Sequence, residues 1–564
     1  MLTTIDLDEA SILSRFLKFK PRPYQNKCIS ELVNGLRHNN DTVLMLPTGM
    51  GKSAIYLPIS MEAADKGLRA CILCATNLLL DQVKRIQAPN FTHKTPMHEI
   101  KGLEHYECKT SGLKADYLFC MSNPKRELCT CGINQESFEQ KTFIITNFAK
   151  YLSTPFKNKF DLVIIDDSHG FENAVEDQFQ HQIAYDRIDD LFRRHDIAGD
   201  MIGEVTGNLM DIFDDIIAAV PPTELTRRVP DDDIKKIGEI KGTDELPSTL
   251  RQANEIDREI YMDLFYFIKK CKDLTQSTFY VQKDYYNPLN PRDAALLARR
   301  SDRYIDNVMR IIFGEARVLL VSAYPGKIDE HVYYSTRRTL SEDKMQVVPK
   351  QKPDDVRLWF RNLSIFEVTD VNSPTETSFD NCVDLTTDLL QRSAVKSLLL
   401  FKNYRDQRKA EIALKQKVKN RKITFIDDTF ETEKVQSLVE EADVIMVSAS
   451  SRLWEGINIS GLRLEIIFSL PFIRPPVYLD RTKSYPYVRR KMLIRLQQGI
   501  GRLIRHPDDR GVCIVLDYAS RPSNQTNLSN HMNSRDFSPE LRDRISTINR
   551  ADVPDKVLAS LTYG

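Results

Sequence analysis

The sequence predicts an α/β protein with two doubly wound parallel-sheet domains, the first of which carries a small cysteine-rich insertion and a mostly helical insertion. Short apolar runs, each about as long as a buried strand, occur in two sets with helical patterns between them. Residues 176–315 interrupt the first set, and four cysteines cluster in a shorter polar stretch. Alternation of strands and helices is typical of a parallel sheet covered by helices on both faces.

The two sets of runs define the two predicted domains. The first set consists of residues 42–46, 70–75, 142–146, 161–166 and 317–323, and the second of residues 396–401, 422–426, 443–448, 464–469 and 512–516. The long interruption is rich in charge and in amphipathic patterns, so we expect helices there.

Composition bounds the class of protein. The 564 residues are too many for one core, and 41% hydrophobic with 28% charged residues describes a soluble globular protein. Lys plus Arg equals Asp plus Glu, so any basic surface must be local. The N-terminus lacks the apolar core of a signal peptide, and no run approaches the ~20 apolar residues of a membrane span. We therefore expect a cytoplasmic protein without membrane contact, in which clustered thiols bind metal more often than they form disulfides.

A phosphate-binding loop follows the first predicted strand. Its residues are Thr48, Gly49, Met50, Gly51, Lys52 and Ser53. The glycines let backbone N–H groups converge on phosphate oxygens, Lys52 reaches the β- and γ-phosphates, and Ser53 can bind Mg²⁺. Upstream, Gln25 lies where its amide could read adenine; the alternative is an ordinary helix start.

Two carboxylates follow the strand 161–166. Asp166 is predicted to hold Mg²⁺, and Asp167 is next in line to polarise the attacking water. The alternative for such a pair is a helix cap.

The second domain contains the pattern Q-x-x-G-R-x-x-R, formed by Gln498, Gly501, Arg502 and Arg505. Positions 498, 502 and 505 are spaced to share one helix face. Arginines that reach a γ-phosphate from a second domain stabilise the charge of the transition state. The alternative is a solvated basic helix.

These motifs, in this order over residues 22–518, resemble the superfamily 2 helicases and more narrowly the XPD/DinG family. The stretch 76–82 is similar to motif Ia, 166–169 to the DEAH box, 322–324 to motif III, 451–461 to motif V and 498–505 to motif VI. The stretches 101–108 ("KGLEHYEC") and 146–152 are similar to family-specific sequences. The resemblance implies RecA-like domains, with ATP and Mg²⁺ as ligands. It also implies the coupling role of motif V for Trp454, Glu455 and Gly456.

The resemblance also implies domain boundaries. RecA-like domain 1 would comprise residues 1–100, 141–175 and 316–335, and RecA-like domain 2 residues 336–564. An iron–sulfur domain would occupy residues 101–140, and a helical arch residues 176–315. A [4Fe–4S] cluster would be held by Cys108, Cys120, Cys129 and Cys131.

The sequence departs from the family in several places. The closing C-x-C of the cysteine quartet is shorter than usual for either metal, so zinc or no metal are alternatives to iron–sulfur. Asp167 replaces the usual Glu, Phe148 replaces a His, and Asn458 replaces an Asp.

The expected function is an ATP-dependent 5′→3′ DNA helicase that translocates on single-stranded DNA and unwinds duplex or DNA–RNA hybrid. Its expected partners are single-stranded DNA and forked or tailed duplex, and we expect a monomer, associated with the nucleoid when bound to DNA. Two alternatives are a nucleic-acid-dependent ATPase that remodels complexes without strand separation, and a catalytically weak binding subunit of a larger complex.

Overall fold

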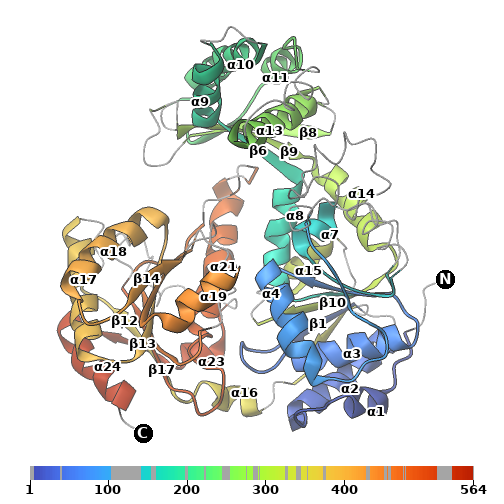
Figure 1. Cartoon of the computed structure of the whole chain (residues 1–564), viewed down its shortest axis with the longest axis vertical. Coiled ribbons are helices and arrows are strands. Elements are labelled where there is room, and N and C mark those ends of the chain that lie inside the picture. Colours follow the sequence, from blue (N-terminus) through green and yellow to red (C-terminus); the bar gives the residue numbers. More distant parts are fainter. Residues whose placement is uncertain are drawn as a thin grey trace.

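A computed structural model of the chain describes residues 5–562 except for 39–40, 103–140, 154–159, 197–200, 222–223, 244–254, 273, 275, 284–289, 291–292, 324–327, 338–344, 352–353, 372–375, 427–431, 450–453, 455–458, 474–475, 477, 480 and 517–536. Figure 1 shows two lower lobes side by side and a third lobe above them. No helix in these ranges combines the length and apolarity that crossing a bilayer requires.

The first lower lobe is built on a seven-stranded parallel sheet in the order β11-β1-β10-β5-β2-β4-β3. Its strands are β1 (Asp41–Met45), β2 (Ala70–Cys74), β3 (His98–Ile100), β4 (Phe143–Asn147), β5 (Leu162–Ile165), β10 (Arg317–Ser322) and β11 (Met345–Val348). Five of these strands were predicted as apolar runs. The other two, β3 and β11, are short and partly polar, so their sequences gave no such signal.

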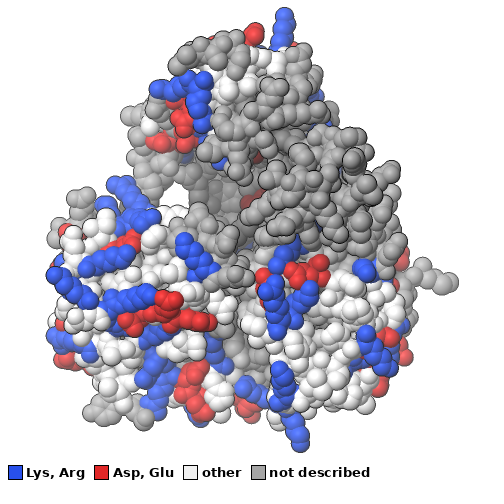
Figure 2. Space-filling view, viewed as in Figure 1, with Lys and Arg blue, Asp and Glu red and all other residues white. Residues whose placement is uncertain are grey.

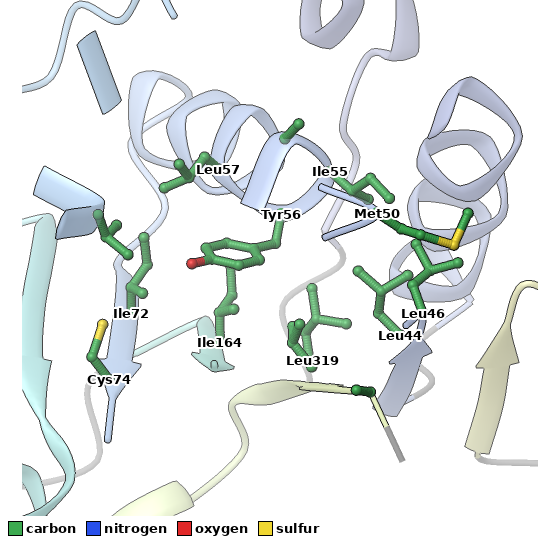
Figure 3. Close-up of a cluster of buried hydrophobic side chains, with 14 of the residues drawn as sticks. Leu44, Leu46, Met50, Ile55, Tyr56, Leu57, Ile72, Cys74, Ile164 and Leu319 are labelled. Atoms are coloured by element: carbon green, nitrogen blue, oxygen red, sulfur yellow. The ribbon is translucent and has the colours of Figure 1, made fainter. Parts of the chain in front are cut away.

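Both faces of this sheet are covered, which explains why its strands are apolar throughout. Alternate strand residues pack into two different cores: Leu44 and Ile72 into one, Val43 and Cys71 into the other. The first core is covered by α2 (Pro23–Arg37) and α3 (Ser53–Asp65). Figure 3 shows Tyr56 of α3 lying over Ile164 of the sheet in that core.

The second lower lobe repeats this architecture with the order β14-β15-β13-β16-β17-β12-β18. Its strands are β12 (Leu363–Val368), β13 (Lys396–Phe401), β14 (Ile423–Ile426), β15 (Val444–Ser448), β16 (Leu462–Ile467), β17 (Gly511–Val515) and β18 (Ile545–Ile548). One face is covered by α17 (Glu376–Arg392), α18 (Tyr404–Lys417) and α24 (Val553–Thr562), and the other by α19 (Thr432–Glu441) and α21 (Arg481–Ile500). The predicted α/β class with two parallel-sheet domains is therefore confirmed.

The sequence predicted the change of domain after residue 335, but the first domain continues beyond it. After α15 (Ile328–Thr336), β11 returns to the first sheet and pairs with β1. The first domain therefore continues to Val348, and α16 (Asp354–Trp359) follows between the two lobes (Figure 1).

The third lobe belongs to the long insertion in the first domain. It contains α9 (Tyr185–Asp196), α10 (Met201–Ala218), α11 (Asp231–Gly238) and α13 (Glu255–Cys271), which share one apolar core. It also contains an antiparallel sheet in the order β6-β9-β8-β7, formed by β6 (Gln180–Ala184), β7 (Thr226–Arg228), β8 (Ser277–Gln282) and β9 (Ala295–Arg300). The sequence did not predict this sheet, because Ala, Leu and Arg in 295–300 are helix formers. Tertiary contacts override that preference in the folded chain.

Two helices connect the third lobe to the first domain. They are α8 (Phe171–Phe179), which follows β5, and α14 (Asp302–Phe313), which precedes β10. Phe171 and Val175 of α8 pack with Ile305 and Met309 of α14 in the second core of the first domain.

Candidate active site

The phosphate loop runs from the end of β1 to the start of α3. Gly49 and Gly51 have φ angles of +86° and +74°, which favour glycine. Between them, the side chain of Met50 is fully buried in the first core. Met50 therefore anchors the loop, while its glycines and the N-terminus of α3 form a cradle suited to an anion.

Two side chains at the start of α2 also hold the loop. The Tyr24 hydroxyl donates to the carbonyl oxygen of Met50 over 2.7 Å, and Gln25 Nε2 donates to the same oxygen over 3.2 Å. Gln25 Oε1 accepts a hydrogen bond from the backbone N–H of Arg22 over 2.8 Å. Both ends of the Gln25 amide thus hold the helix start and the loop, and an adenine contact by Gln25 stays a prediction.

The two carboxylates lie after β5, beside the phosphate loop. Asp166 Oδ2 accepts a hydrogen bond from the Tyr56 hydroxyl over 2.7 Å. Burial, and then the charge of Asp167, raise the pKa of Asp166 to about 7. A carboxylate with such an excess of negative charge around it fits a divalent cation. Ser53 and Asp166 would hold Mg²⁺, which supplies charge neutralisation to phosphate oxygens.

Asp167 has an unusual backbone conformation. Its φ is 48°, in the left-handed region, and its Oδ1 lies 3.9 Å from Lys52 Nζ. Among residues other than glycine, Asp and Asn enter this region more readily than Glu. The conformation is therefore a physical reason for Asp at a position where the resembled family has Glu.

The second domain contributes α21 and the turn after it. The amide of Gln498 contacts His169 Nε2 of the first domain, and both side chains are buried. Arg502 donates a hydrogen bond to the carbonyl oxygen of Trp454. Trp454 Nε1 in turn donates to the carbonyl oxygen of Arg495 over 3.0 Å. Trp454 thus contacts both α21 and Arg502. Glu455 and Gly456 fall outside the described residues.

Arg505 lies directly against the phosphate loop. A Cβ atom at Gly49 would come within 2.7 Å of the Cα atom of Arg505. Burial lowers the pKa of Arg505, and Asp509 acts against that effect. A phosphate group beside the guanidinium would favour its charged form.

These elements enclose one pocket of about 280 Å³ between the two domains. Ten of the predicted site residues line it: Thr48, Gly49, Gly51, Lys52, Ser53, Asp166, Asp167, Gln498, Arg502 and Arg505. Gln25 and Met50 do not line it; they support the loop from outside. Three cations from two domains therefore face one space that is large enough for phosphate groups, with a carboxylate pair at its side.

Five further residues line the pocket and were not predicted as site residues. They are Leu79, Gln82, Val83, Gln87 and Ala323. Leu79 belongs to α4 (Asn77–Asp81), and Gln82, Val83 and Gln87 belong to η1 (Gln82–Gln87). Leu79 and Gln82 lie in the stretch 76–82 that resembles motif Ia, and Ala323 lies in the stretch 322–324 that resembles motif III. For Val83 and Gln87, which also follow β2, the signal was the carboxyl edge of the parallel sheet, where ligands bind in such folds.

Comparison with known families gives two matches, one in each domain. The family model of the type III restriction enzyme res subunit matches residues 18–195, and that of the helicase C-terminal domain matches residues 386–535. The first match contains the phosphate loop and the carboxylate pair, and the second contains Gln498, Arg502 and Arg505.

Several similar proteins are named helicases, and one is named an exonuclease. A probable ATP-dependent helicase of Methanocaldococcus jannaschii is 22% identical, over 90% of this chain and 93% of its own. The 3′-5′ exonuclease DinG of Staphylococcus haemolyticus is 22% identical over 93% of this chain and 70% of its own, and the ATP-dependent DNA helicase YoaA of Escherichia coli is 35% identical over 16% of each chain. A solved XPD helicase structure covers 94% of this chain and 100% of its own, with a TM-score of 0.64 and 14% identity. The Xpd4 structure of S. tokodaii covers 93% and 100%, with a TM-score of 0.56 and 14% identity.

The chain is an XPD/DinG-like superfamily 2 helicase.

In an XPD/DinG-like helicase, the pocket between the two domains is the candidate nucleotide site, and residues of both domains line it. The four cysteines 108, 120, 129 and 131 lie outside the described residues, so the structure does not test the cluster. The remaining cysteines are a different kind of residue: Cys28, Cys71, Cys74, Cys271, Cys382 and Cys513 are all buried. Burial raises the pKa of Cys28 to about 12, as expected for a thiol that packs rather than binds metal.

Proposed function

We propose that this helicase is a DNA helicase that couples ATP hydrolysis to 5′→3′ movement on single-stranded DNA. The observation that carries the proposal is the composition of the pocket. Lys52 and Asp166 come from the first domain, and Arg502 and Arg505 come from the second. The set of groups proposed for hydrolysis is therefore complete only when the two domains are together.

Hydrolysis in such a site has a simple assignment of roles. Lys52 and the loop bind the phosphates, and Asp167 orients the attacking water. Arg502 and Arg505 stabilise the charge that develops on the γ-phosphate, so they act mainly in the transition state. Loss of that phosphate weakens the link between the domains, and alternate tightening and loosening would move the nucleic acid.

Single-stranded DNA, with forked or tailed duplex as the structured substrate, is the proposed ligand, and the proposed acting form is a monomer. Figure 2 shows Lys and Arg interspersed with Asp and Glu over the described surface of both lower lobes. Surface pairs such as Lys417–Asp384 and Arg392–Asp388 belong to this mixed surface. Binding would therefore depend on a local basic path that follows the nucleic-acid backbone, without a sequence preference.

The cysteine-rich insertion is the proposed site of a [4Fe–4S] cluster. Four thiols in one polar stretch contrast with the six buried cysteines elsewhere, and the stretch is at the family's position for the cluster domain. Structural zinc is the alternative metal for the same four thiolates.

ATPase and strand-separation assays on duplexes with a 5′ or a 3′ single-stranded tail, with protein purified without oxygen, test the proposal. Unwinding of the 5′-tailed duplex alone is the expected result. Unwinding of the 3′-tailed duplex alone would contradict the proposed direction and leave the ATPase assignment in place. DNA-stimulated hydrolysis without strand separation would instead identify a translocase, and slow hydrolysis in every assay would identify the weak binding subunit that the short Asp167 side chain suggests.

A further inference from the structure

A buried cluster of charges joins the two domains at a distance from the nucleotide pocket. Glu172 of α8 is 3% exposed, and it meets two cations of α21 from the other domain. Arg490 Nη2 donates to both carboxylate oxygens of Glu172, over 3.0 and 3.1 Å. Lys491 Nζ lies 2.6 Å from Glu172 Oε2. Arg490 and Lys491 are each 4% exposed, so all three charged residues are buried.

The surroundings of the cluster leave Glu172 as the central anion. Burial alone would raise the pKa of Glu172, but Lys491 and Arg490 hold it below its ordinary value. His331 lies in the same region, and burial lowers its pKa to about 3, so it adds no charge. The carboxylate of Glu330 is 4.0 Å from Arg490 Nε and is partly exposed.

The cluster lies on the two elements that build the ATP site. Glu172 follows the Asp166–Asp167 pair in the first domain. In the second domain, α21 ends just before Arg502 and Arg505. Arg490 precedes Gln498 by eight residues, roughly 12 Å along a helix. The contact between Gln498 and His169 is thus one attachment of α21 to the first domain, and Glu172 provides a second. Two attachments along one helix fix both its position and its rotation.

The energetics make this second attachment dependent on all three charges. When the domains separate, water reaches the three side chains and each is solvated. When the domains meet, the carboxylate and the two cations lose water together. A buried ion cluster of this kind tolerates replacement of all its members by apolar residues, but it does not tolerate loss of one partner, because an uncompensated charge then remains buried.

We propose that Glu172 is a positioning residue that docks α21 on the first domain and so places Arg502 and Arg505 at the nucleotide. This inference rests on the proposed ATP-driven function and adds an element of its control: closure of the ATP site requires an ionic contact that no nucleotide touches. Glu172 itself takes no part in the chemistry.

The first test compares steady-state hydrolysis by the full-length protein and its Glu172→Gln variant. We expect kcat to fall on the order of 10²-fold, since a misplacement of about 1 Å has effects of this size. We expect the affinity for ATP to change by no more than about threefold, because the phosphate loop belongs to the first domain alone.

The matched control is Glu62→Gln. Glu62 is also 3% exposed and also pairs with one arginine and one lysine, Arg15 and Lys66, but all three belong to the first domain. This variant should have a lower melting temperature and an unchanged kcat. A defect in kcat equal to that of Glu172→Gln would show that loss of any buried charge has this effect, and it would overturn the proposal.

A rescue experiment separates docking from a general folding defect. The triple variant Glu172→Leu, Arg490→Met, Lys491→Met removes all three charges and keeps similar volumes. We expect it to recover kcat to within about tenfold of the wild type, since apolar replacement of a whole buried cluster is often neutral. A triple variant as impaired as Glu172→Gln would contradict the charge argument.

Domain closure provides a readout that does not require hydrolysis. Fluorescence energy transfer between dyes on the two domains should report closure when the wild type binds Mg²⁺ and adenylyl imidodiphosphate. Closure should be lost in Glu172→Gln and restored in the triple variant. A wild type that fails to hydrolyse ATP would contradict the proposed function, whereas normal hydrolysis and closure in Glu172→Gln would contradict only this inference.

Discussion

Gly49 and Arg505 belong to different domains, yet their backbones are in contact: a Cβ atom on Gly49 would lie 2.7 Å from Arg505 Cα and 3.0 Å from its carbonyl oxygen. Neither atom belongs to a flexible side chain, so the second domain must shift to accept a methyl group at this position. The closeness of the domains at the ATP site is therefore set by the absence of a side chain at Gly49.

Gly49→Ala should reduce ATP hydrolysis on the order of 10²-fold, because the displaced Arg505 no longer reaches the nucleotide correctly. The control is Gly67→Ala, since Gly67 has a similar φ of +83° but has no atom within 4 Å of its hypothetical Cβ among the described residues. Gly67→Ala carries the backbone strain alone and should lower stability by about 1–2 kcal/mol while turnover stays near the wild-type value. Steady-state ATPase rates and melting temperatures of both variants make the comparison, and equal turnover in the two would contradict it.

Lys52→Ala and Arg505→Ala should fail in different ways. Lys52 contacts bound phosphate in the ground state, so its loss should weaken ATP binding and abolish turnover. Arg505 acts in the transition state, so Arg505→Ala should bind ATP normally but lose kcat by a factor on the order of 10³. Arg361→Ala, which removes a surface pair with Asp508, is the control for loss of a cation. Equilibrium binding of a fluorescent ATP analogue, beside the ATPase assay, separates the two outcomes; normal turnover in both variants would remove the helicase assignment.

Asp167 offers a test of charge separate from backbone conformation. Asp167→Asn retains a residue that tolerates the left-handed region, so its fold and ATP affinity should stay unchanged while hydrolysis is lost. Asp167→Glu restores the reach usual in the family and should keep or raise the rate, with a small loss of stability from the same backbone constraint. Single-turnover hydrolysis and thermal melting measure both effects. An inactive Glu variant would show that the site has adapted to the shorter side chain.

Glu465 predicts a pH dependence of stability. It lies fully buried in β16, and neither carboxylate oxygen has a hydrogen-bond partner in the described part of the chain. Burial raises its pKa to about 8, against the effect of Arg502. In the unfolded chain the carboxyl ionises near pH ~4.3, so between these values the folded state holds a proton that the unfolded state releases. The folded state therefore loses stability as the pH rises from about 4 to about 8.

Glu465→Gln should remove this loss. The melting temperature of the variant should exceed that of the wild type at pH 8 by several degrees, at about 2–4 °C for each kcal/mol, and the difference should vanish near pH 4. Glu440→Gln, on an exposed side chain of the same domain, should show no such trend. Calorimetric melting at a series of pH values measures the effect, and parallel curves for Glu465→Gln and the wild type would contradict it.

The four clustered cysteines predict a metal content. Protein purified without oxygen should be brown and contain close to four irons per chain. Because thiolate ligands couple folding to metal binding, Cys108→Ser should make residues 101–140 sensitive to protease and abolish strand separation, while ATP binding at Lys52 survives. Cys28→Ser, in the buried core, is the control and should keep the iron. Elemental analysis decides the matter: stoichiometric zinc without iron would replace the cluster, and a metal-free, fully active protein would rule out a metal role.

The sequence predicted the parts of the site that depend on local chemistry. Lys52 and Asp166 each follow a buried strand at the carboxyl edge of the sheet, and Arg505 is marked by its spacing from Gln498. Contacts between distant segments gave no such signal. The role of Gln25 depends on Met50, whose buried side chain fixes the loop, and this pairing follows from tertiary packing alone.

The same limit explains the missing elements of the fold. The strand Ala295–Arg300 consists mainly of residues that favour helices, and it becomes a strand because it pairs with β6 and β8. Glu172 belongs to none of the sequence motifs. Its partners Arg490 and Lys491 are more than 300 residues away in the sequence, so only the folded chain shows that they meet.

The pairing of β6 with β9 has a consequence for how this protein could diversify. The chain enters the third lobe through β6 and leaves it through β9, and the two strands are antiparallel neighbours with Gln180 opposite Arg299 and Ala184 opposite Ala295. Because β6 and β9 are adjacent, the segment between them is a loop whose two ends are already in contact. The length of that segment therefore adds little to the entropy cost of closing the loop. A two-residue hairpin turn or a foreign module could replace everything beyond Ala184 and Ala295 without moving either stem. Replacement of the lobe at these two strands would leave the sheet and the covering helices of the first domain in place.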